Sequence, residues 1–168
     1  ENLYRLLNYG GPGGGIGASM RYLSQRFTAP NRVCMAVLTD VATEELGHLE
    51  MVSTIVHQLT ANLTVEEIEN QGFADYYVDH AVGIWPQSAG GIPFNSCEFQ
   101  SKGDPITDMF ESMAAEQKAR STYDNILRVV RDIPEIADPI RFLRAREVVH
   151  FQRFGEALDS ARDYLNQQ

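Results

Sequence analysis

The sequence predicts an all-α protein, a four-helix bundle in which one long crossover joins the second and third helices. Four segments, a short one followed by three long ones, carry apolar residues at three- and four-residue spacings. Between the second and third segments this spacing disappears for about 30 residues, a length usual only for functional loops and long crossovers. The 168 residues suit a single domain, 1–168.

The first two helices are expected on either side of Pro30. The first runs from about Gly15 to Ala29, and its apolar face consists of Ile16, Met20, Leu23 and Phe27. The second runs from about Asn31 to Ala61, with Val37, Val41, Val52, Ile55 and Leu59 on one face. At 1.5 Å per residue it would be about 45 Å long, which is typical of a bundle.

The crossover is expected to begin with a short helix. Thr64 and Glu67 form a capping-box pattern, which predicts a helix that ends near Gln71. The segment 72–103 is rich in glycine, proline and aromatic residues and shows no helical period. A connection of this kind, running the length of the bundle, would join two parallel helices.

The third and fourth helices are each expected to open on an Asp-Pro pair, Asp104-Pro105 and Asp138-Pro139, in the favoured N-cap and N1 order. The third helix would present Met109, Met113, Glu116, Tyr123, Leu127 and Val130 on one face. The fourth would present Ile140, Leu143, Glu147, His150, Phe154, Ala161 and Leu165.

Composition excludes several classes of protein. The net charge of −9, from 14 Lys and Arg against 23 Asp and Glu, disfavours binding of nucleic acid through a broad basic face. The only two cysteines, Cys34 and Cys97, exclude a disulfide scaffold and a thiolate zinc finger. No apolar run is long enough for a membrane helix, and Glu1–Asn8 lacks the pattern of an export signal.

Charged residues interrupt three of the predicted apolar faces at mid-length. Glu45 and His48 on the second helix, and Glu147 and His150 on the fourth, are three residues apart, so each pair shares a helix face. Glu116 lies on the apolar face of the third helix. Buried carboxylates are costly unless they are paired or bind a metal, so these three helices imply a common cation.

This pattern provides three of the four contributions of a dimetal carboxylate bundle, in which two helices give Glu-x-x-His and two give Glu. The first helix lacks its carboxylate, since no acid occurs between Glu1 and Asp40. The glycine run at 10–17 is not a phosphate loop, because neither the Lys-Ser/Thr pair nor a βαβ pattern accompanies it.

Five stretches carry a resemblance that spans nearly the whole chain: LLNYGG at 6–11, ASMRYL at 18–23, TEELGHLEM at 43–51, MAAEQKA at 113–119 and REVVHF at 146–151. They resemble the ferritin-like manganese catalase family, and within it the short spore-coat branch of the CotJC type. The resemblance implies a dimanganese site that disproportionates hydrogen peroxide to water and oxygen, a homo-oligomer that is hexameric, and a cytoplasmic or spore-coat location.

By this resemblance Glu45 would bridge two manganese ions and His48 would bind the first. Glu116 and His150 would bind the second, and Glu147 would serve as the catalytic proton acceptor and donor. The family has a glutamate where this chain has Gly15. The first metal would then keep only His48 and the bridging Glu45, which predicts impaired occupancy and turnover.

Two alternatives stay open. One is a structural spore-coat component that contacts other coat proteins and has a vestigial or partly occupied metal site, as the absent ligand at Gly15 suggests. The other is an iron-oxidising bundle, because carboxylate and imidazole ligands do not distinguish iron from manganese.

Overall fold

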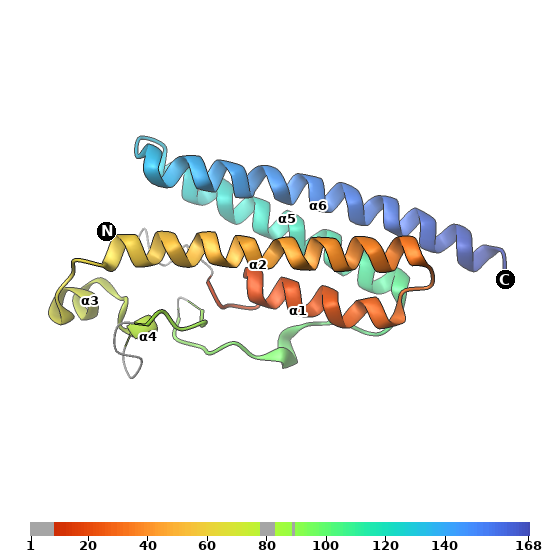
Figure 1. The fold of residues 1–168 in the computed structure, drawn as a ribbon, viewed down its shortest axis with the longest axis horizontal. Helices are drawn as coiled ribbons and strands as arrows, with labels where there is room; N and C mark the ends of the chain where they lie inside the picture. Colours follow the sequence, from red (N-terminus) through yellow and green to blue (C-terminus); the bar gives the residue numbers. More distant parts are fainter. Residues whose placement is uncertain (1–8, 78–82, 89) are drawn as a thin grey trace.

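The computed structural model describes residues 9–77, 83–88 and 90–168. Over these ranges the chain is helical apart from loops and one isolated β-bridge between Gln87 and Pro93. The four bundle helices in Figure 1 are α1 (Gly15–Gln25), α2 (Arg32–Thr60), α5 (Pro105–Val130) and α6 (Pro134–Asn166). The predicted all-α bundle is confirmed, whereas the expectation about an export signal concerns residues outside these ranges.

The crossover follows the end of α2 and returns along the bundle to the start of α5, so these two helices run parallel (Figure 1). It contains two short helices, α3 (Val65–Gln71) and α4 (Ala74–Tyr77), and the single turn η3 (Ser96–Glu98). A second single turn, η2 (Arg26–Thr28), follows α1. The long connection thus makes α2 and α5 parallel, as the sequence predicts.

Side-chain caps define three of the helix starts. The Asn31 carboxamide oxygen accepts a hydrogen bond from the Cys34 amide at 2.9 Å, and the Asp104 carboxylate accepts one from the Thr107 amide at 2.7 Å. The predicted capping box of α3 is formed in both directions by Thr64 and Glu67. Each cap satisfies amide groups that have no partner within the helix.

The predicted start of the last helix is wrong. Helix α6 begins at Pro134, and Pro139 lies inside it. Ile136 and Ala137 explain the difference, because both are buried in the apolar core and their burial favours an extra turn before the Asp-Pro pair. The helix tolerates Pro139 at this position. Proline has no amide hydrogen to donate to the carbonyl of Glu135, but Glu135 is an exposed residue near the helix start, where water can reach that carbonyl.

The predicted apolar face of α1 is also wrong. Phe27, expected in the core, lies in the following turn and is 80% exposed. The buried side of the helix is mostly polar or small and consists of Gly17, Ala18, Ser19, Arg21, Tyr22 and Gln25. Hydrogen bonds, such as that from Ser112 to the Gln25 carboxamide oxygen at 3.0 Å, hold this face to α5.

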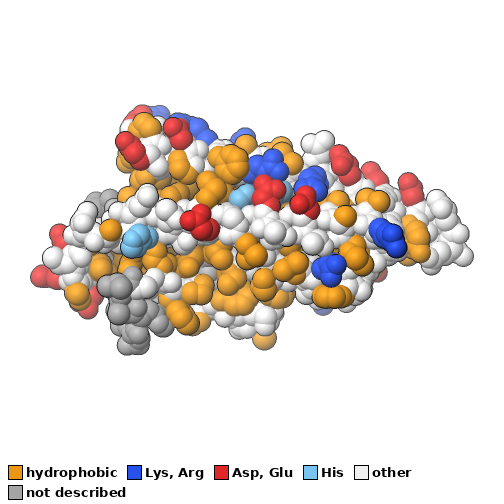
Figure 2. Space-filling view, in the orientation of Figure 1, with side chains coloured by type: hydrophobic (Ala, Val, Ile, Leu, Met, Phe, Trp, Pro, Cys, Tyr) orange, Lys and Arg blue, Asp and Glu red, His pale blue; other side chains and the backbone are white. Residues whose placement is uncertain are grey.

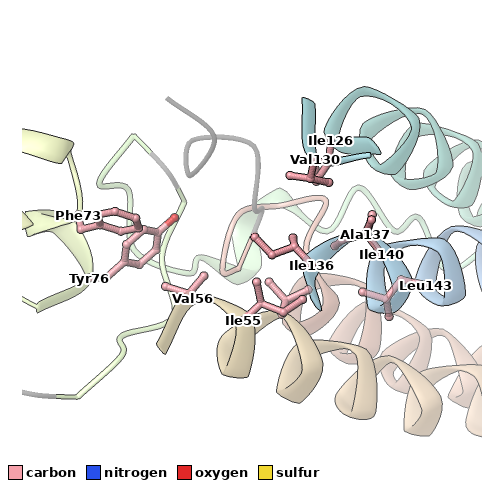
Figure 3. Packing of buried hydrophobic residues seen from close by; sticks show 11 residues of the cluster. Ile55, Val56, Phe73, Tyr76, Ile126, Val130, Ile136, Ala137, Ile140 and Leu143 are labelled. Carbon is pink, nitrogen blue, oxygen red and sulfur yellow. The ribbon is translucent and has the colours of Figure 1, made fainter. Parts of the chain in front are cut away.

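The bundle has two apolar clusters, one toward each end. One cluster joins the C-terminal half of α2 to the start of α6 and the end of α5, as Figure 3 shows for Ile55, Ile126, Ile136, Ile140 and Leu143 among others. The other cluster includes Tyr22, Cys34, Leu38, Met109 and Phe154. The charged residues singled out in the sequence fall between these clusters on α2, α5 and α6.

The surface is mixed in character. In Figure 2, acidic, basic and histidine side chains gather at mid-length over the junction of α2 and α6, while hydrophobic side chains are scattered over the rest of the visible face. None of the described helices combines the length and the hydropathy that crossing a membrane requires.

Gly15 brings α1 against α2 at the turn that begins with Glu45. A Cβ atom at position 15 would lie 2.9 Å from the Glu45 carbonyl oxygen and 3.1 Å from the Leu49 amide nitrogen. Both are backbone atoms, so a side chain here requires the two helices to separate. Gly47, on the exposed side of the same turn, has no atom within 4 Å of its would-be Cβ.

We therefore expect opposite effects from two alanine substitutions. Gly15→Ala should lower the free energy of unfolding by about 1–3 kcal/mol because it overpacks a helix contact. Gly47→Ala should raise it by roughly 0.5–1 kcal/mol because alanine favours a helix more than glycine does. Urea unfolding of the metal-free protein measures both; equal destabilisation by the two substitutions would contradict the close approach at Gly15.

Candidate metal centre

Five titratable side chains from three helices meet between the two apolar clusters. They are Glu45 and His48 of α2, Glu116 of α5, and Glu147 and His150 of α6, and each is no more than 5% exposed. The three-residue spacing within α2 and α6 turns each carboxylate and its imidazole toward the bundle interior, and the antiparallel helices bring the two pairs face to face. All five residues predicted for the site are therefore brought together.

The imidazoles lie almost in contact with the carboxylates. His48 Nδ1 is 3.1 Å from Glu45 Oε1 and 3.7 Å from Glu147 Oε1. His150 Nδ1 is 3.0 Å from Glu45 Oε1 and 3.3 Å from Glu116 Oε2. The two imidazole rings are stacked with centroids 5.3 Å apart. Glu45 is thus the carboxylate shared by both histidines.

These groups fit a divalent cation. One ligand atom from each of Glu45, His48, Glu147 and His150 lies within 4.8 Å of the other three. Among the described residues, Glu116 Oε2 and both ring nitrogens of His150 are buried and form no well-aligned hydrogen bond, although carboxylate oxygens lie 3.0 and 3.3 Å from His150 Nδ1. Oxygen and imidazole nitrogen donors that converge in this way suit manganese or iron, and no cysteine takes part.

The pKa values of the site residues reflect burial and neighbouring charges when no metal is bound. Desolvation raises the pKa of Glu147 strongly, and the charges of Glu45 and Glu116 raise it further. Burial alone would lower the pKa of His150, but the carboxylates of Glu116 and Glu45 outweigh it and raise the value to about 10. For Glu45, burial is outweighed by His150 and His48, so its pKa lies below the usual range.

Tyr22 of α1 is a buried neighbour of the cluster that the apolar pattern does not reveal. Its hydroxyl donates a hydrogen bond to Glu116 Oε1. Burial, followed by the charge of Glu116, raises the tyrosine pKa well above its usual value. Tyr22 therefore stays protonated and holds one oxygen of Glu116, which leaves the other oxygen facing the cluster.

Glu44 and Arg146 cover the outer side of the two histidines. Glu44 Oε2 lies 3.2 Å from His150 Nε2, and Glu44 Oε1 lies 3.6 Å from His48 Nε2. Arg146 donates to both oxygens of Glu44. Burial raises the pKa of Glu44, but Arg146 and His150 outweigh it and bring the value to about 2. An ionised Glu44 favours a proton on the Nε2 atom of His150, which leaves the Nδ1 atom of that ring to bind a cation.

The sequence signal for Glu44 and Arg146 was present but weak. Both lie next to a residue of a Glu-x-x-His pair, a position that places a side chain at the edge of the site rather than inside it. Gly15, which stands where the resemblance leads one to expect a carboxylate, lies beside the Glu45 backbone. Arg120, four residues after Glu116, forms an ion pair with Asp124 at 2.6 Å and not with Glu116.

Three comparisons place these observations among known proteins. The family model described as manganese containing catalase matches residues 4–167. Protein CotJC of Bacillus subtilis is 44% identical over 160 residues, which cover 95% of this chain and 84% of that protein. A probable manganese catalase of Clostridium acetobutylicum is 29% identical over 92% of this chain and 68% of its own length. The crystal structure of KatB, a manganese catalase from Anabaena, matches with a TM-score of 0.82 and 30% identity over 94% of this chain and 71% of that one.

The raised pKa values predict how the metal-free protein responds to pH. His150 binds its proton more tightly when folded, so its contribution to stability is complete below about pH 6.5 and is lost as pH rises toward about 10. Glu147, also raised, acts in the same direction. The free energy of unfolding should fall by roughly 3–5 kcal/mol between about pH 7 and pH 9, since each group loses about 1.4 kcal/mol per pH unit.

Urea unfolding in the presence of a chelator measures this dependence. His150→Gln should flatten it, whereas His57→Gln, which removes an exposed histidine of the same helix bundle, should leave the slope unchanged. Stability that rises over this range would contradict the protonation states assigned to the cluster.

Proposed function

Because the chain belongs to the manganese catalase family, we propose that it binds manganese through the buried Glu and His cluster and disproportionates hydrogen peroxide, with a first metal site weakened by Gly15. The observation that carries the proposal is the convergence of Glu45, His48 and His150 between the two apolar clusters, with the Glu147 carboxylate beside them and one atom of each within 4.8 Å of the others. The closely approaching Glu116 completes the donor set.

We assign the metal-binding roles to Glu45, His48, Glu116 and His150. Glu45 suits a bridging ligand because one of its oxygens lies about equally close to the Nδ1 atoms of His48 and His150, at 3.1 and 3.0 Å. A bound manganese pair supplies the exchange of two electrons, in which one peroxide is oxidised to oxygen and another is reduced to two waters. Iron would bind the same donors, so the metal is assigned from the family.

Glu147 is the proton-transfer residue of the proposal. Its carboxyl is buried, and its raised pKa means that it holds a proton at neutral pH when the cluster is free of metal. With a metal bound and this proton displaced, the Glu147 carboxylate would accept one proton from the peroxide that is oxidised and return it to the peroxide that is reduced, while solvent would carry the second proton.

Glu44 and Arg146 act as positioning residues. Glu44 faces the Nε2 atoms of His48 and His150, and its two hydrogen bonds from Arg146 fix its orientation. Outer contacts of this type set the tautomer and the direction of a metal-binding imidazole. Tyr22 has the same role toward Glu116 on the opposite side.

We also propose assembly into a homo-oligomer, with a hexamer as the expectation from the family. Large apolar side chains exposed on α2 and α6 support an interface there: Phe142 is 51% exposed, Val148 42% and Leu46 41%. A cytoplasmic or spore-coat location, and contacts with other coat proteins, belong to the same proposal and rest on the similarity to CotJC.

The catalytic proposal is tested by metal content and oxygen release after growth with manganese. The parent protein should bind at least one manganese ion per chain and release oxygen from peroxide. Glu147→Gln should retain the metal but lose at least about a hundredfold in rate, since general acid–base groups contribute on this scale.

His150→Gln should lose metal, and His57→Gln should resemble the parent. Less than one metal ion per chain together with no oxygen release would refute the proposal, and elemental analysis distinguishes manganese from iron.

A structural coat component with a vestigial metal site is the second candidate, favoured by Gly15. Gly15→Glu and Gly15→Ala separate the two functions because both introduce the same Cβ contact with α2, while only glutamate adds a ligand. If the protein is an impaired enzyme, Gly15→Glu should raise metal content and oxygen release above both the parent and Gly15→Ala. If neither variant binds more metal and assembly is unchanged, the structural function is supported.

A further inference from the structure

A cavity lies between the start of α1, the middle of α5 and the crossover segment near η3, beside Val52 of the apolar cluster that includes the C-terminal half of α2. Its volume is about 710 Å³, enough for a small organic molecule. Gly13 and Gly14 line it at the start of α1, and Ala119 and Tyr123 line it on α5.

Arg21 lines this cavity and forms no ion pair with any residue that the structure describes. Its side chain is only 4% exposed, and its Nε atom has no hydrogen-bond partner among the residues that the structure describes. Its one hydrogen bond runs from a terminal nitrogen to the Tyr22 hydroxyl at 3.2 Å. A buried guanidinium without an anion is costly, which makes Arg21 the strongest sign of an absent partner in this part of the chain.

The start of α1 adds to the positive potential in the cavity. Its N-cap is Gly14, which provides no side-chain cap, and its first turn contains no acidic residue. The N-terminal end of a helix carries a partial positive charge and unpaired amide groups, so it favours an anion. Arg21 and this helix end lie on the same cavity, one through its side chain and the other through Gly13 and Gly14.

The other walls restrict the class of anion. Lys118, at the exposed rim, is already paired with Glu111 at 3.1 Å, and the carboxylate of Glu98 lines the same cavity. One unpaired cation therefore matches one negative charge, and Glu98 would repel a dianion. Val52 and Ala115 add apolar lining, which suits an organic remainder.

We propose that this cavity is a binding site for a small monocarboxylate, whose carboxylate accepts hydrogen bonds from the Arg21 guanidinium in a cavity that the N-terminal end of α1 also lines. The planar fork of a guanidinium matches the two oxygens of a carboxylate better than it matches a tetrahedral oxyanion with a second charge. The apolar part of the ligand lies against Val52 and the alanines of α5. This site is distinct from the Glu and His cluster and does not depend on a bound metal.

Benzoate is a suitable probe because it combines one carboxylate with a compact apolar body. Calorimetric titration of the full chain should show saturable binding of one benzoate per chain, both with manganese and after treatment with a chelator. Benzamide, which has the same shape without the charge, and inorganic phosphate should bind at least about tenfold more weakly. Equal binding of benzoate and benzamide, or tighter binding of phosphate, would overturn the assignment.

Two substitutions locate the binding. Arg21→Gln should weaken benzoate at least about tenfold, whereas Arg32→Gln, which removes an exposed arginine at the start of α2, should leave the affinity unchanged. Ala119→Leu fills the cavity while keeping Arg21, so it should also abolish binding and decides the matter if Arg21→Gln does not fold. Unchanged affinity in a folded Ala119→Leu protein, binding only to the manganese-loaded chain, or no saturable binding would refute the proposal.

Discussion

The structure depends on a charged layer buried across the middle of the bundle. Glu45, Glu116 and Glu147 meet His48 and His150 between two apolar clusters, where an unpaired charge costs several kcal/mol. Without a metal, the layer is neutralised by protons, as the raised pKa values of Glu147 and His150 indicate. A cation would displace these protons, so metal binding and protonation are alternative ways to stabilise the same layer.

The arrangement of the helices follows from this layer. A Glu-x-x-His pair uses one face of a helix, and antiparallel α2 and α6 place two such faces opposite each other. The long crossover brings α5 in parallel to α2, so that Glu116 enters from the third side. Helix α1 closes the fourth side without a carboxylate: Gly15 approaches the α2 backbone, and Tyr22 donates a hydrogen bond to Glu116.

The sequence predicted the elements that depend on local signals and missed those that depend on tertiary contacts. The capping box at Thr64 and the Asp104 cap follow from local hydrogen bonds, and both were predicted correctly. The start of α6 was wrong because burial of Ile136 overrides the Asp-Pro pattern. The buried face of α1 was wrong because Tyr22 and Gln25 are held by polar partners on α5, which an apolar period cannot reveal. The five site residues could be predicted because a charged residue inside an apolar helix face is itself a local signal. The contact between Glu44 and Arg146 could not, because it joins positions 102 residues apart.

The absent carboxylate at Gly15 changes the charge balance of the layer as well as its ligand count. Two divalent ions would bring four positive charges against at most three negative ones, from Glu45, Glu116 and Glu147, because Glu44 is already balanced by Arg146. A single divalent ion is balanced by Glu45 and Glu116 with Glu147 protonated, which is the state that the raised pKa of Glu147 favours. In electrostatic terms the proposed manganese pair would therefore need an anion from solvent beside its second ion. Gly15 packs directly against the α2 backbone, so the contact that brings α1 close to α2 leaves no room for a side chain at this position unless the helices separate.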